Sequence, residues 1–131
     1  MGLFDALFGK SGNSETARTL PWIPLETSGQ IDDIKKNSVE RPQVIFKHST
    51  TCGISRMVLN GFQKSYPFSA EEADLYYLDL HAHRNISNRV AEEFQVVHQS
   101  PQLLVVKNEK VVFHTSHGAI TEVDLDRFLQ P

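Results

Sequence analysis

The sequence lacks a second cysteine, since Cys52 is the only one in 131 residues. A disulfide-stapled fold is therefore excluded for this stretch of chain. An excess of positive charge is missing too, because 13 Lys and Arg stand against 16 Asp and Glu, a net charge of -3. We expect no attraction to nucleic acid or to an anionic membrane from that balance. No apolar run approaches the roughly 20 residues that span a bilayer, so we expect no membrane span.

The N-terminal residues 1–18 differ in kind from the rest of the chain. A few apolar residues there have helical spacing: Leu3, Phe4, Leu7 and Phe8. A polar stretch rich in Gly and Ser follows them. We therefore expect a flexible or amphipathic segment over 1–18 and one domain over 19–131. No secretory signal is visible, and a lone cysteine favours a reducing compartment, so the expected location is the cytoplasm.

From residue 20 onwards, strand and helix signals alternate. The expected elements are a strand at 22–25, a helix capped by Ser28, a strand at 43–48, a helix from the thiol to about 66, a strand at 74–80, a helix at about 85–94, a strand at 102–106, a turn at 108–109, a strand at 111–113 and a helix from about 121 to 129. This order, βαβαβαββα, predicts an α/β fold with a mixed sheet covered by helices on both faces. That arrangement is the thioredoxin-like architecture.

The thiol lies where the second strand meets its helix. Free backbone N–H groups and the positive end of the helix favour thiolate over thiol at such a junction, so Cys52 is a candidate nucleophile. Thr50, Thr51 and Ser55 can donate hydrogen bonds to the sulfur and lower its pKa, although helix capping explains at least one of them equally well. Ser55 also occupies the place where a Cys-x-x-Cys enzyme keeps its resolving cysteine, which predicts a monothiol mechanism.

In the thioredoxin architecture, an X-Pro bond just before the fourth strand is cis and packs beside the sulfur. Ser100-Pro101 occupies that place here. We therefore expect a cis bond at Pro101 by analogy with the fold, because the dipeptide alone does not establish it.

Three strings of residues occur together and in order: KHSTTCxIS over 47–55, LDL over 78–80 followed by HRxISN over 83–88, and HxSPQ over 98–102. Together they resemble the monothiol bacilliredoxins, thioredoxin-like proteins of the bacillithiol system. The resemblance covers roughly residues 20–129. Gly53 and Gln99 depart from the expected pattern, which bears on thiol acidity and specificity more than on the fold.

The resemblance implies a thiol–disulfide oxidoreductase. Cys52 would remove bacillithiol from bacillithiolated proteins and would itself become linked to bacillithiol. A second bacillithiol molecule would then release the adduct, since Ser55 cannot resolve it, and a reductase would recycle the bacillithiol disulfide. Bacillithiol is thus the expected co-substrate, and no tightly bound cofactor is expected.

The resemblance also suggests which residues contact the small thiol. Bacillithiol carries a malate moiety, whose carboxylates would favour the cations Lys47, His48 and Arg56; for Lys47 and His48, a solvated strand end is the alternative. Ser100, before Pro101, could pair its backbone with an extended thiol ligand in strand fashion.

Other functions remain open at this point. Asp79-x-His81-x-His83 and His114-x-x-His117 suggest metal binding, but structural zinc usually needs four ligands, and we expect none here. Cys-Gly-Ile-Ser also resembles the Cys-Gly-Phe-Ser of monothiol glutaredoxins, which hold a [2Fe–2S] cluster between two subunits. The Gly-Gly pair expected of that family is absent, because residues 117–119 read His-Gly-Ala. A non-catalytic thioredoxin-like adaptor is a third possibility.

Overall fold

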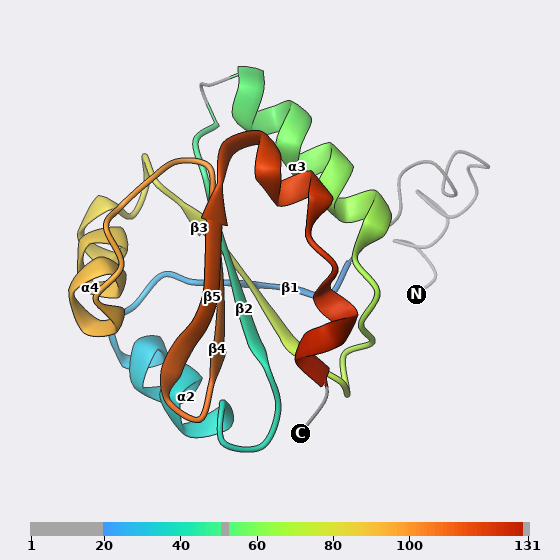
Figure 1. Cartoon of the computed structure of the whole chain (residues 1–131). Coiled ribbons are helices and arrows are strands. Elements are labelled where there is room, and N and C mark those ends of the chain that lie inside the picture. The colour runs from blue at the N-terminus through green and yellow to red at the C-terminus, as the bar shows by residue number, and fades with distance from the viewer. Residues whose placement is uncertain (1–19, 51–52, 130–131) are drawn as a thin grey trace, which may run out of the picture.

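The computed structural model describes residues 20–50 and 53–129 (Figure 1). The expected N-terminal segment over 1–18 lies outside the described residues, as do Thr51 and Cys52, so the domain boundary stays a prediction. The elements are β1 (Trp22–Pro24), α2 (Gly29–Asn37), β2 (Gln43–His48), α3 (Gly53–Ser65), β3 (Asp74–Asp79), α4 (Arg84–Phe94), β4 (Gln102–Lys107), β5 (Lys110–Ser116) and the 3₁₀ helices η3 (His117–Glu122) and η4 (Leu125–Leu129).

The five strands form one mixed sheet in the order β1-β3-β2-β4-β5. β1 and β2 both run parallel to β3, while β4 runs antiparallel to β2 and β5 antiparallel to β4. Parallel neighbours need a crossover, and α2 and α3 supply the crossovers of this sheet. The predicted α/β class and mixed sheet are therefore confirmed.

Helices cover both faces of the sheet (Figure 1). On one face, α3, η3 and η4 cover a core that includes Phe46, Phe62 and Leu103. On the other face, α2 and α4 cover a core that includes Ile45 and Leu104. Since successive strand residues point to opposite faces, Phe46 and Ile45 enter different cores. The same alternation places the next two residues of β2 on different faces.

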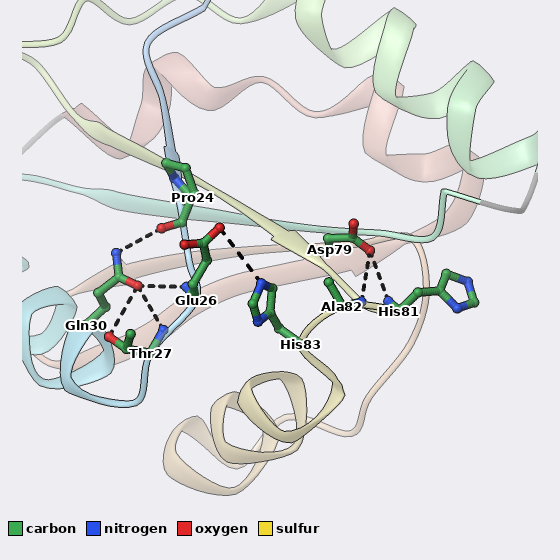
Figure 2. A network of polar contacts seen from close by, with 8 residues as sticks. All are labelled: Pro24, Glu26, Thr27, Gln30, Asp79, His81, Ala82 and His83. Carbon is green, nitrogen blue, oxygen red and sulfur yellow. Dashed lines mark hydrogen bonds and ion pairs between the residues drawn. The ribbon is translucent and has the colours of Figure 1, made fainter.

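The start of α2 differs in detail from the expectation. Ser28 does occupy the N-cap position, but its side chain makes no capping hydrogen bond. The carboxamide oxygen of Gln30 instead accepts the backbone N–H groups of Glu26, at 2.7 Å, and Thr27, at 3.0 Å (Figure 2). A side chain inside the first turn thus fixes the entry of the chain into the helix.

The apolar face of α3 also differs from the sequence-based expectation, which is a helical face of Ile54, Val58 and Phe62 flanked by Met57 and Leu59. Val58 and Phe62 are buried as expected, but Ile54 is 62% exposed and Met57 72% exposed. Ser55 takes the buried position of the first turn. The buried face of α3 therefore begins with a polar side chain.

The end of the chain corrects one predicted element. In place of a single closing α-helix, the chain forms η3 and η4. The η3 segment lies close against α3, since a Cβ on Gly61 would be 2.9 Å from Cγ2 of Thr121. Before it, the predicted turn joins β4 and β5, with Asn108 and Glu109 both at positive φ, as a tight hairpin requires. Within the described ranges, no helix is long and apolar enough to cross a bilayer.

Candidate functional site

The candidate site lies at the carboxyl end of β2, where the chain enters α3. Cys52 and Thr51 lie outside the described residues, so their predicted roles stay predictions. Their neighbours Thr50 and Gly53 are exposed, and Gly53 is the first residue of α3. A 13-residue helix presents free N–H groups and a positive dipole end at this point. The thiol is therefore attached next to an end that stabilises negative charge.

Ser55 is bound to the strand that precedes the thiol. Its side chain is fully buried, at 0% exposure. Its hydroxyl oxygen accepts the backbone N–H of Ser49 at 3.2 Å and lies 2.9 Å from Nδ1 of His48. Ser55 thus connects the first turn of α3 to the end of β2, and this contact explains why a polar residue is buried there.

His48 is buried on the same sheet face as α3. Its ring lies 5.7 Å from that of Tyr77, centroid to centroid. The pKa of His48 is lowered by burial and by Arg56, and Asp79 opposes part of that lowering. A neutral imidazole is therefore favoured. The expected direct contact of His48 with carboxylates of a small thiol does not fit this buried position.

Lys47 is not at a solvated strand end, which corrects that alternative, because its side chain is buried inside the protein. Its side chain is 0% exposed on the face covered by α4. Nζ lies 3.3 Å from Nδ1 of His98 and 3.5 Å from the carbonyl oxygen of Ser87. Burial lowers the pKa of Lys47 from 10.5 to about 8. An enclosed amino group cannot bind a carboxylate in solution, so the expected ligand contact does not fit this structure.

Arg56 is exposed on the first turn of α3, close enough for its charge to act on His48. Of the three cations expected to meet the small thiol, it alone is accessible. The basic part of the predicted site is therefore reduced from three side chains to one.

His81 joins the site although sequence reasoning considered it only as a metal ligand. Nε2 of His81 lies 3.0 Å from Oγ of Ser49, three residues before the cysteine. The backbone N–H of His81 donates to the carboxylate of Asp79 at 3.0 Å (Figure 2). The sequence could have indicated that His81 lies near Ser49, because parallel strands bring their carboxyl ends to one edge of a sheet. In this sheet His48 pairs with Asp79.

The histidines after β3 do not converge. Figure 2 shows the rings of His81 and His83 pointing in different directions, with His83 turned towards Glu26. Nε2 of His83 lies 3.8 Å from the Glu26 carboxylate. In the part of the chain that the structure describes, no group of three His, Cys, Asp or Glu side chains could hold a metal ion.

Ser100 and Pro101 lie just beyond the paired part of β4, whose ladder with β2 ends at Lys47 and Gln102. The Ser100–Pro101 peptide bond is cis. The Ser100 hydroxyl is buried without a hydrogen-bond partner among the described residues. A ligand would therefore meet the backbone of Ser100 and not its hydroxyl. The Pro101 carbonyl is used internally, since it accepts the N–H of His117 at 3.1 Å.

Comparison with known proteins agrees with this geometry. Residues 23–125 match the family model described as monothiol bacilliredoxin BrxC. A solved structure of a candidate oxidoreductase with a thioredoxin fold is 29% identical, with a TM-score of 0.66, over 76% of this chain and 86% of that chain.

Two thioredoxins show the same fold at lower identity. Thioredoxin of Malassezia sympodialis is 16% identical, with a TM-score of 0.62, over 85% of this chain and 88% of its own. Thioredoxin of Schistosoma mansoni is 16% identical, with a TM-score of 0.60, over 82% of this chain and 92% of its own. These two likenesses support the fold alone.

Proposed function

The chain belongs to the monothiol bacilliredoxin family, and from this premise we propose that Cys52 removes bacillithiol from protein mixed disulfides. Membership of this family, with its thioredoxin-like fold, supports redox thiol exchange in general. The narrower proposal names the small thiol and the nucleophile. The observation that carries it is Ser55, a buried serine where a dithiol enzyme keeps its second cysteine.

The proposed reaction has two exchange steps. In the first, the Cys52 thiolate attacks the bacillithiol sulfur of the mixed disulfide, the substrate S–S bond breaks, and the substrate thiolate leaves and takes up a proton. In the second, a bacillithiol thiolate attacks the bacillithiol sulfur on Cys52, which leaves as thiolate. One bacillithiol disulfide forms for each substrate thiol restored. A reductase that supplies two electrons must then split that disulfide.

In this proposal, the accessible site residues contact the ligand, and the buried ones act through neighbouring side chains. Arg56 offers an exposed cation to the malate carboxylates, and Ser100, directly before the buried Pro101, offers its backbone to the extended ligand. Thr50 and Thr51 remain proposed hydrogen-bond donors to the sulfur. Lys47 and His48 act from within the protein, through His98 and Ser55 respectively. The cytoplasm is the proposed location, because a small-thiol pool must be kept reduced there for the second step.

Intact mass spectrometry tests the proposal directly. The protein is mixed with a bacillithiolated substrate protein, in parallel with the glutathionylated form of the same substrate, and Cys52→Ala is the control. We expect one bacillithiol on the wild-type chain, none on Cys52→Ala and little transfer of glutathione. Equal transfer of both thiols would refute bacillithiol specificity, and transfer of neither would refute the exchange function. Family membership favours exchange over the [2Fe–2S] carrier and the adaptor.

A further inference from the structure

Lys47 is a lysine buried in the protein interior. Lys47 ends its side chain inside the protein at 0% exposure, on the sheet face opposite α3. Burying an ammonium group is costly unless its environment compensates. In the described chain none of the salt bridges involves Lys47. Such a residue lowers the stability of the fold, so its role lies in the group that its amino group contacts.

The amino group holds the imidazole of His98. Nζ of Lys47 lies 3.3 Å from Nδ1 of that ring, and Oγ of Ser87 lies 3.2 Å from the same nitrogen. A charged lysine can only donate, so Nδ1 accepts and the ring proton sits on Nε2. The contact thus fixes both the orientation and the tautomer of His98.

Every described charge that acts on His98 is positive. Burial lowers the pKa of His98, and the positive charges of Lys47, on β2, and of Arg84, at the start of α4, lower it further. A protonated His98 could not accept from Lys47, and it would face two cations. The neutral ring is therefore the form that keeps this contact.

His98 belongs to the loop 95–101 that connects α4 to β4. Its backbone is held by the N–H of Val96, which donates to Ala91, and by Gln102, which binds two loop backbone groups. The side chain of Val96 is also buried in the core of this sheet face. His98 adds a polar contact between the loop and the neighbouring strand β2. Two residues further on is Ser100, followed by Pro101, the pair proposed to receive the small thiol.

We propose that Lys47 and His98 are positioning residues of the exchange site, which hold the loop 95–101 against β2 and so place Ser100 and Pro101 for the small thiol. The inference rests on the proposed function for its consequence, but the contact itself does not. Lys47 touches neither the ligand nor the sulfur in this role. Its effect reaches the reaction through His98 and the backbone of the loop.

The experiment compares the full-length wild type with Lys47→Met, which keeps the length of the side chain and removes the donor. Lys64→Met is the matched control, because Lys64 is an exposed lysine in the last turn of α3. Three quantities are measured: the ¹⁵N chemical shifts and pKa of the His98 ring, amide hydrogen exchange over residues 97–100, and KM for a bacillithiolated peptide. The rate of Cys52 modification by a small aromatic disulfide reports the intrinsic reactivity of the thiolate.

In Lys47→Met we expect the pKa of His98 to rise, and loop amide exchange and KM to increase by about three- to tenfold, the range for loss of one hydrogen bond. Cys52 modification stays within about twofold, and Lys64→Met matches the wild type in every measurement. Unchanged loop exchange and KM in an active Lys47→Met protein would overturn the positioning role. A wild type that accepts no bacillithiol would instead overturn the proposed function, whatever the loop does.

Discussion

The hydroxyl of Ser55 lies 2.9 Å from Nδ1 of His48, across the turn that carries the thiol. A hydroxyl has one proton, so the tautomer of His48 determines whether Ser55 donates that proton to the ring. With the ring proton on Nε2, Ser55 donates to His48; with the proton on Nδ1, Ser55 accepts and keeps its own proton for another acceptor. The serine that replaces a resolving cysteine is thereby coupled to a neutral histidine on β2.

Removing that hydroxyl should destabilise the fold. In Ser55→Ala, the Ser49 N–H and the buried His48 ring each lose a partner, and we expect a loss of about 1–3 kcal/mol in the free energy of unfolding. Urea unfolding measures it. Ser65→Ala, at the exposed end of the same helix, is the control and should change stability by less than about 0.5 kcal/mol. Equal effects of the two substitutions would contradict the role assigned to Ser55.

Restoring a cysteine at this position should change the mechanism. In the wild type, the bacillithiol adduct on Cys52 persists until a second bacillithiol arrives. In Ser55→Cys, the new thiol can attack Cys52 of the adduct, releasing bacillithiol and closing an internal disulfide 2 Da lighter than the dithiol, as two-electron oxidation of two thiols requires. Mass spectrometry of a single turnover without added bacillithiol distinguishes the two. An adduct as persistent in Ser55→Cys as in the wild type would count against this prediction.

The fold was largely predictable because its signals are local. The apolar runs of β2 and β4 and the positive-φ turn at Asn108–Glu109 read directly from the sequence. The closing segment could not be predicted in the same way, because Val123 has an extended backbone conformation, φ −76° and ψ 136°, which separates η3 from η4 where one helix was expected. Local periodicity names the buried residues there but does not fix the helix type.

The site was harder to predict because its contacts join distant parts of the chain. Strand alternation alone places Lys47 on the same sheet face as Ile45, away from α3. This orientation could therefore have been predicted from the sequence. What it could not show is that His98, 51 residues later, encloses the amino group. Likewise the contact of His81 with Ser49 depends on the register that pairs His48 with Asp79.

Arg56 gives a prediction about ligand affinity. It is the accessible cation among those expected to meet the small thiol, so Arg56→Gln should raise KM for a bacillithiolated peptide about two- to fivefold, the range for an exposed ion pair. The effect should shrink at high salt, because exposed charges are screened. Lys64→Gln removes a charge from the far end of the same helix and should leave KM unchanged. A salt-independent loss, or equal losses in both variants, would argue against a carboxylate contact.

Lys47 predicts an unusual dependence of stability on pH. Burial lowers its pKa from 10.5 to about 8, so below pH 8 the folded protein holds a charge it disfavours, at a cost of about 3 kcal/mol. Between pH 8 and 10.5 the folded form loses the proton while the unfolded chain keeps it, so this group makes stability rise with pH. Lys47→Met removes the cost. Its stability advantage over the wild type, measured by urea unfolding, should therefore be largest at pH 7 and shrink by about 3 kcal/mol towards pH 10.5. An advantage that stays constant over that range would show that Lys47 titrates as an ordinary lysine.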